Sequence, residues 1–188
     1  MSSTGELADL DDALAGTQRV VAGIAPGQWP DSTPCPGLDV RTVLNHLVTG
    51  NMVFTALIRR EPAPDPAADH LGDDPVAAFR TAGQALRQAF AVPSVLETTY
   101  TAPFGTAPGA VLAQVRVIEL LVHGWDLARA TGQRPDFPAG TVERALAAAR
   151  RQLAGRPRGP GAPFAAEVPV PGDAAPIDRL AGFLGRQP

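Results

Sequence analysis

The sequence predicts an all-α fold, a four-helix bundle with short C-terminal helical segments packed on its outside. Four long segments carry apolar residues at helical spacing, and Pro- and Gly-rich stretches separate them. The chain has 188 residues, 45% of them hydrophobic, which suits one domain with a real core and is short for two. We therefore expect a single domain over 1–188, with the bundle core at about 6–131 and a C-terminal extension at 132–188.

The first two helices are expected on either side of a Pro-rich loop. Apolar residues at helical spacing predict the first helix from about Glu6 to Ile24, closed by Gly27. Asp39 is a good N-cap residue, so the second helix should start there and run to about Arg60. Pro62 and the prolines after it then end that helix and open a polar linker.

The third and fourth helices follow the linker. Pro75 suits a first helical turn and predicts a helix over about Pro75–Ala91. Tyr100 and Thr101 favour a short extended piece, which the prolines and glycines of 103–109 should break. The fourth helix is expected over about Ala110–Ala130, with Gly132 beyond its end as a stop.

The sequence of the C-terminal extension predicts two more helices. An alanine-rich helix is expected over Thr141–Leu153 and a short last helix over Ile177–Leu184. The stretch Gly155–Pro176 is rich in proline and glycine and should be irregular.

Composition excludes several classes of function. The net charge is −3 and no basic stripe is present, so we expect no nucleic-acid partner. The N-terminus lacks the pattern of a signal peptide, and no apolar run reaches bilayer length, so no membrane partner is expected. The single cysteine, Cys35, fits a reducing compartment and a cytoplasmic location. A homodimer is plausible, because helix bundles often pair through an exposed helix face.

The main functional clue is a carboxylate and an imidazole four residues apart in an otherwise apolar helix. Glu119 and His123 lie on one helix face, and Asp126 follows His123 at i+3 on the same face. His46 lies in the apolar second helix. Because helix bundles build metal sites from side chains on facing helices, His46, Glu119 and His123 are candidate ligands.

Two imidazoles and one carboxylate suit Zn²⁺ or a similar divalent ion. Three protein ligands leave a position open for water or a thiol, which is the pattern of catalytic zinc. The alternative is a solvent-facing Glu–His pair without a metal. The apolar neighbours of the pair and the small residue Gly124 favour the metal interpretation.

Asp126 has three possible roles, as a fourth ligand, as a partner that orients His123, or as a general base. A salt bridge to Arg129 at i+3 is the structural alternative. We favour an orienting or structural role. Arg116, three residues before Glu119, is expected to pair with Glu119.

Other reactive residues carry weaker signals. The Pro-Cys-Pro turn at Cys35 is more typical of a rigid start to a helix than of a nucleophile. His70 lies among aspartates, where a solvated charge cluster is expected, and Trp125 should belong to the core or a pocket wall.

Three motifs resemble an actinobacterial branch of the DinB-like proteins, whose members resemble the metal-binding N-terminal domain of mycothiol-dependent maleylpyruvate isomerase. The first is Thr33–Pro36 followed by Asp39–Arg41 and Leu44–Leu47. The second is Glu119–Ala128, and the third is the tail Pro176–Arg186. The resemblance covers almost the whole chain.

The resemblance implies a DinB-like bundle with a divalent metal on His46, Glu119 and His123. It also implies a thiol cosubstrate such as mycothiol, and a transferase or isomerase acting on a small electrophilic substrate. A metal-dependent hydrolase, lyase or cyclase of secondary metabolism is the enzymatic alternative. A non-catalytic protein that binds small molecules is the third.

Overall fold

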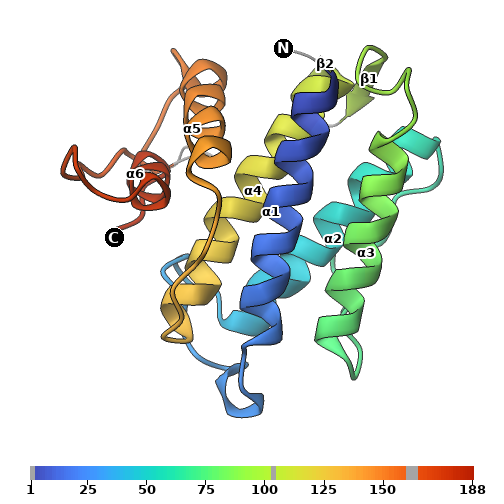
Figure 1. Ribbon diagram of the computed structural model, residues 1–188. Coiled ribbons are helices and arrows are strands. Elements are labelled where there is room, and N and C mark those ends of the chain that lie inside the picture. The colour runs from blue at the N-terminus through green and yellow to red at the C-terminus, as the bar shows by residue number, and fades with distance from the viewer. Residues whose placement is uncertain (1–2, 103–104, 160–164) are drawn as a thin grey trace.

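The computed structural model describes residues 3–102, 105–159 and 165–188. Helices α1 (Ser3–Ala22), α2 (Val40–Arg59), α3 (Pro75–Phe90) and α4 (Gly109–Ala130) form a bundle, with α5 (Ala139–Leu153) and α6 (Pro176–Phe183) beside it (Figure 1). A 3-10 turn, η1 (Pro26–Gln28), follows α1. The predicted all-α bundle is confirmed.

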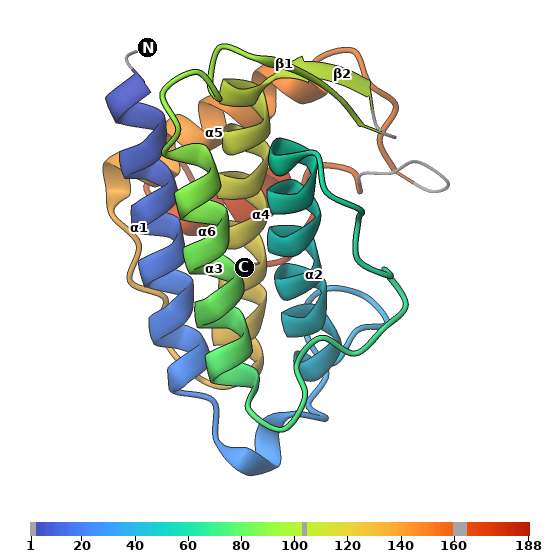
Figure 2. The same cartoon turned by 90° about the vertical axis from the view of Figure 1, so that its right-hand side faces the viewer.

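Contacts between helices define the order around the bundle. Helix α1 packs on α3 and α4, and α2 packs on the same two helices, so α3 and α4 separate α1 from α2. The second view shows α2 beside α4 (Figure 2). Helices α5 and α6 pack on each other and on α4, so α4 contacts both the bundle and the C-terminal segments. Its position explains why fifteen of its residues are buried.

Side-chain caps fix the starts of two helices close to their predicted positions. The Asp39 carboxylate accepts from Thr42 N at 2.8 Å, and the Asp74 carboxylate accepts from Ala77 N at 2.9 Å. Pro75 occupies the first turn of α3, as expected. Gly132 has a φ of 69°, the left-handed conformation that ends α4. Each long helix begins and ends within three residues of the prediction.

The prediction that the prolines and glycines of 103–109 break the short extended piece was wrong. Thr99–Ala102 (β1) and Gly105–Pro108 (β2) form an antiparallel hairpin, with Thr99 opposite Pro108 and Tyr100 opposite Ala107. A two-stranded ribbon has only edge strands, which tolerate the proline and glycine that were expected to break it. Pro103, one of those expected breakers, lies outside the described residues.

The C-terminal segments lie as expected on the outer side of α4. The Trp125 indole donates to Asp178 Oδ1 at 2.8 Å and so joins α4 to α6. The connection between α5 and α6 has no helix or strand in its described part, and residues 160–164 of it lie outside that part. Among the described helices, none combines the length and the apolar character needed to cross a bilayer.

Candidate metal centre

The structure brings the three predicted ligands together between α2 and α4. His46 Nε2 lies 3.0 Å from Glu119 Oε2, and His123 Nε2 lies 3.6 Å from the same oxygen. The two imidazole rings have centroids 5.0 Å apart and are nearly perpendicular. The side chains are 50%, 30% and 9% exposed for His46, Glu119 and His123, so the group lies at the end of a solvent-accessible opening.

These distances suit a small divalent ion. The three donor atoms lie within 4.8 Å of one another. Two ligands at about 2.0–2.2 Å from a tetrahedral Zn²⁺ are roughly 3.4 Å apart, so only small side-chain movements are needed. The donor set of two imidazole nitrogens and one carboxylate oxygen is one that zinc uses in catalytic sites. The residues present therefore fit a metal.

Asp126 lies beside His123. Its Oδ2 lies 2.9 Å from His123 Nδ1, and its side chain is fully buried. An ionised carboxylate only accepts hydrogen bonds, so a neutral His123 carries its proton on Nδ1 and leaves its Nε2 lone pair available to a metal beside Glu119 and His46. This is the tautomer that a metal ligand requires, and the orienting role of Asp126 stays a prediction.

Arg186 holds Asp126 from the other side. Its Nη2 donates to Asp126 Oδ2 at 2.9 Å and its Nε donates to Oδ1 at 3.2 Å. Arg186 follows α6, so the C-terminal tail reaches the back of the centre. The resemblance included this tail without giving Arg186 a role, because a contact across sixty residues has no local spacing signal.

The imidazoles and carboxylates of the centre shift each other's pKa values. Burial alone would raise the pKa of Glu119, but the His123 and His46 imidazoles outweigh it and hold that pKa well below its usual range. Burial alone would lower the pKa of His123, but contact with Asp126 and Glu119 raises it. Without a metal, the centre therefore favours an anionic Glu119 beside a His123 that is readily protonated.

Arg116 does not form the ion pair with Glu119 expected from spacing. Its side chain is buried, and its Nη2 donates to Asn51 Oδ1 at 2.8 Å. Burial lowers its pKa to about 10, so it stays charged at neutral pH. Two guanidinium groups therefore lie near the two carboxylates of the centre. Arg186 forms an ion pair with Asp126, whereas Arg116 acts on Glu119 through its charge without an ion pair.

Cys35, from the loop before α2, also lies beside the centre. Arg186 Nη2 lies 3.6 Å from its Sγ, and Cys35, His123 and Asp126 form a second group with donor atoms within 4.8 Å. This group fits a metal less well, because Asp126 is already bound by both His123 and Arg186. Burial also raises the pKa of the Cys35 thiol, which disfavours the thiolate that binds metals.

The remaining candidates have structural contacts. Arg129 lies over the Trp125 ring, 5.4 Å from its centroid, and does not pair with Asp126. Trp125 is buried, as expected. His70 lies outside the centre, where its ring Nε2 contacts the Asp65 carbonyl at 2.8 Å and its backbone N–H donates to Asn45.

Two separate cavities share Val115 and Glu119 among their lining residues. One, of about 280 Å³, lies between α2 and α4 and includes His46, Phe54 and Arg116. The other, of about 300 Å³, lies between α4 and α5. Both are large enough for parts of small molecules, and each borders a candidate metal ligand.

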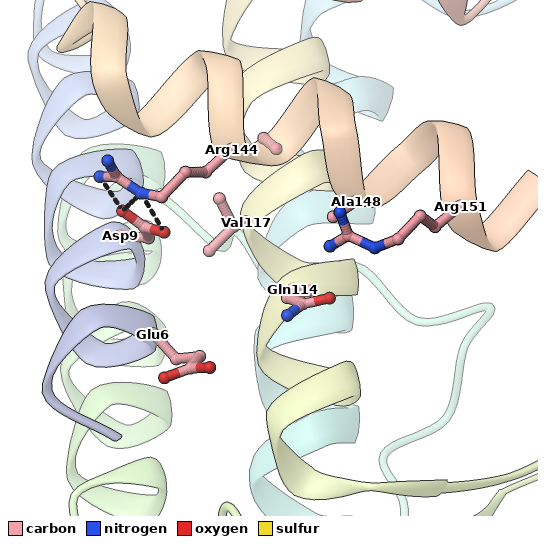
Figure 3. A pocket seen from close by; sticks show the side chains of 8 residues that line it. Glu6, Asp9, Gln114, Val117, Arg144, Ala148 and Arg151 are labelled. Carbon is pink, nitrogen blue, oxygen red and sulfur yellow. Dashed lines mark hydrogen bonds and ion pairs between the residues drawn. The ribbon is translucent and has the colours of Figure 1, made fainter. Parts of the chain in front are cut away.

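A third, small pocket shares no residue with these two. It lies between α1, α4 and α5, and its volume of about 20 Å³ is enough for roughly one water molecule (Figure 3). Arg144 Nε donates to both oxygens of Asp9 there, at 3.0 Å each. This pocket is therefore a packing feature where an ion pair joins α1 to α5, and it is too small for a substrate.

The family model described as "Mycothiol maleylpyruvate isomerase N-terminal domain" matches residues 10–128. The chain is 38% identical over 176 residues to the uncharacterized protein Rv0738 of Mycobacterium tuberculosis H37Rv, covering 93% of this chain and 92% of that protein. The uncharacterized protein MT0763 of the CDC 1551 strain matches to the same extent.

Solved structures share the fold. The crystal structure of mycothiol-dependent maleylpyruvate isomerase aligns with a TM-score of 0.64 at 15% identity, over 78% of this chain and 68% of that chain. A point mutant of that enzyme aligns equally well. At this identity the likeness establishes the architecture alone.

Proposed function

This chain belongs to the family of the mycothiol maleylpyruvate isomerase N-terminal domain, and from that premise we propose that it is a metal-binding enzyme that uses a low-molecular-weight thiol. The family expected from the sequence motifs is thereby confirmed. The proposed reaction is a transfer or isomerisation in which the thiol attacks a small electrophile. Mycothiol is the proposed thiol, because the family and the aligned enzyme carry its name.

One observation carries the proposal. His46, Glu119 and His123 converge from two helices, and the buried Asp126 carboxylate lies 2.9 Å from His123 Nδ1, on the side of the ring away from Glu119. Burying a carboxylate and an imidazole together is costly unless they bind each other or a ligand. The 50% exposure of His46 keeps the group open to incoming molecules.

The residues have separate roles in the proposal. A Zn²⁺ ion bound by the three ligands would supply Lewis-acid chemistry, lowering the pKa of a bound thiol so that a nucleophile forms at neutral pH. Glu119 contributes the one negative charge among the ligands. Asp126 accepts from His123 Nδ1 and so leaves Nε2 available, and two hydrogen bonds from Arg186 hold the Asp126 carboxylate in place.

The test uses purified protein loaded with Zn²⁺. Metal content is measured by mass spectrometry, and mycothiol is titrated into the loaded protein by calorimetry. We expect about one metal per chain and thiol binding that requires it. The His46→Ala and Glu119→Gln variants should lose most of the metal and, with it, the thiol binding.

The control is His70→Ala, which removes the one histidine outside the centre. This variant should retain both metal binding and thiol binding. Loss of metal from His70→Ala but not from His46→Ala would contradict the site. Absence of both metal and thiol binding in the wild-type protein would contradict the function. Metal binding without thiol binding would instead favour the hydrolase, lyase or cyclase alternative.

A further inference from the structure

The guanidinium of Arg116 is buried in the bundle without an ion-pair partner. Arg116 is only 2% exposed, and among the described residues no carboxylate lies within ion-pair distance of it. Its Nη2 donates to Asn51 Oδ1 at 2.8 Å and lies 3.4 Å from the Leu47 carbonyl oxygen, and both acceptors are uncharged. A buried charge is costly unless it is paired and fully hydrogen-bonded, so Arg116 retains capacity for an anion.

One nitrogen of this guanidinium reaches the cavity between α2 and α4. A Cβ atom at Gly50 would lie 2.5 Å from Arg116 Nη1, so Nη1 lies against the Gly50 backbone, and both residues line the cavity. No described residue accepts a hydrogen bond from Nη1, which water can reach, whereas the unpartnered Nε is enclosed by protein. Nη1 is therefore an open donor in the cavity wall.

The rest of the cavity suits a small apolar body. Its walls include Val53 and Phe54 of α2 and Val115 of α4, and its volume is about 280 Å³. The centroid of the Phe54 ring lies 5.4 Å from Arg116 Cζ, so an aromatic face covers part of the guanidinium. A cavity of about 150 Å³ can hold a benzene ring, so this one has room for a substituted ring beside Nη1.

Glu119 lines the same cavity and would repel an anion. Its Oε2 is already engaged, because it lies 3.0 Å from His46 Nε2 and 3.6 Å from His123 Nε2. The Arg116 guanidinium has no comparable counter-charge in contact with it among the described residues. Guanidinium groups bind planar oxyanions such as carboxylates through charge-assisted hydrogen bonds, which indicates the kind of group that the cavity accepts.

We infer that the α2–α4 cavity is an anion site, in which Arg116 Nη1 donates to the carboxylate of a small molecule whose apolar body lies against Val53, Phe54 and Val115. The idea that this molecule is a reactant of the neighbouring centre rests on the proposed function. The binding itself depends only on the cavity and on Arg116.

The probes are benzoate and benzamide, which share a ring and a planar head group and differ in charge. Each is titrated by calorimetry into the Zn²⁺-loaded full chain and, separately, into the full chain with a chelator present, because a carboxylate also binds zinc. Benzoate should bind at least about ten-fold more tightly than benzamide under both conditions. Equal binding of the two probes, or a preference for benzoate that the chelator abolishes, would overturn the inference.

Arg116→Met removes the cation and keeps a long side chain, so benzoate should weaken by at least about ten-fold while benzamide is unchanged. Asn51→Leu is the matched control, because it removes the same buried hydrogen bond and leaves the guanidinium in place, so the preference for benzoate should remain. Equal losses of benzoate binding in the two variants would mean that Arg116 acts only through the packing of α2 on α4.

Two further variants keep the test decisive. If Arg116→Met alone does not fold, the double variant Arg116→Met/Asn51→Leu replaces both partners of their hydrogen bond and leaves no orphaned group from it. Val53→Phe adds a ring at a half-buried position in the cavity wall and should weaken both probes. Circular dichroism verifies that each variant is folded, and probe binding that Val53→Phe leaves unchanged would place the anion outside the cavity.

The outcomes separate this inference from the proposed function. If the protein binds neither metal nor mycothiol while benzoate stays sensitive to Arg116→Met, the proposed function fails and the anion site holds. If metal and mycothiol bind but benzoate shows no preference over benzamide, the anion site alone fails. Benzoate that binds together with mycothiol assigns the site to the electrophile, and benzoate that mycothiol displaces assigns it to the thiol.

Discussion

At the scale of single residues, the centre is a chain of contacts from the tail to the opening. Arg186 holds Asp126, Asp126 holds His123, and Glu119 lies between His123 and His46. The spacing of Glu119, His123 and Asp126 along one helix was enough to predict that these three side chains, all on α4, lie together. Spacing could not predict Arg186 or the approach of Cys35, because those contacts depend on how the tail and the loop before α2 fold back.

Replacing Arg186 should weaken both stability and metal binding. Arg186→Gln leaves the fully buried Asp126 with His123 as its only ion-pair partner among the described residues. We expect a loss of about 3 kcal/mol in the free energy of unfolding, as when one partner of a buried pair is removed. Metal affinity should fall by at least about ten-fold, because the proposed ligand His123 loses part of its support. Urea denaturation and a competitive metal titration measure the two effects.

The control for Arg186 is Arg19→Gln. Arg19 pairs with Asp136 at 3.8 Å, and both side chains are mostly exposed. Exposed pairs contribute little, so stability and metal affinity should hardly change. Equal effects of the two substitutions would mean that Arg186 does not support the centre.

The pH dependence of the metal-free protein should reflect His123. Its pKa in the folded protein is raised above the usual value of about 6.5 by Asp126 and Glu119. Its contribution to stability is therefore complete below about pH 6.5 and is lost as the pH rises through the higher folded value. Metal affinity should change in the opposite direction, because a metal needs the neutral imidazole.

Urea denaturation between about pH 5.5 and 8.5, with a chelator present, measures this contribution. Wild-type protein should lose stability relative to His123→Gln as the pH rises across that range. A difference between the two proteins that is independent of pH would contradict the role of His123.

At the scale of elements, glycines permit the close packing that positions α4. A methyl group added at Gly124 would lie 2.9 Å from Thr17 Oγ1 on α1 and from the Phe137 ring. Thr17 itself donates to the Leu120 carbonyl of α4 at 3.0 Å. The sequence indicated that Gly124 leaves space near His123, but the neighbour that uses this space, α1, could not be read from helical periodicity.

Gly124→Ala should therefore destabilise the protein although alanine is the better helix former. Propensity favours alanine by about 1 kcal/mol, and overpacking costs about 1–3 kcal/mol, so a net loss is expected. Gly5→Ala on α1 is the matched control, because an added methyl meets nothing within 4 Å there. Urea denaturation should show a loss for Gly124→Ala alone, and a gain from both substitutions would contradict the close packing of α1 on α4.

Element boundaries were predictable where local chemistry sets them, as at the caps of Asp39 and Asp74. The hairpin of β1 and β2 was not predictable in this way, because residues such as Gly105 and Pro108 resemble strand breakers until the pairing partner is known. Gly109 illustrates this limit. A methyl group there would overlap the Val95 carbonyl oxygen, so this glycine serves a close approach at the start of α4 rather than a flexible loop.

At the scale of the whole molecule, α4 links the bundle to the C-terminal segments, because it contacts α1, α2, α5 and α6. The same helix supplies two candidate ligands and borders both cavities at Glu119. We expect the extension at 132–188 to unfold together with the bundle, since separating them would expose the apolar face of α4 and break the bond from Trp125 to Asp178.

The test is thermal unfolding of a Trp29→Phe variant, in which Trp125 is the only tryptophan left. Its fluorescence reports the contact between α4 and α6, and far-ultraviolet circular dichroism reports the helices of the bundle. The two transitions should coincide. If the fluorescence signal is lost at a temperature well below that at which the helices unfold, the extension is a separate unit.

The most direct measurement is anomalous X-ray diffraction at the zinc edge from crystals grown with Zn²⁺. The account predicts one strong peak per chain, at about 2.0–2.2 Å from the Nε2 atoms of His46 and His123 and from a Glu119 carboxylate oxygen. A peak bound instead by Cys35 and Asp126, or crystals with no peak between α2 and α4, would contradict it.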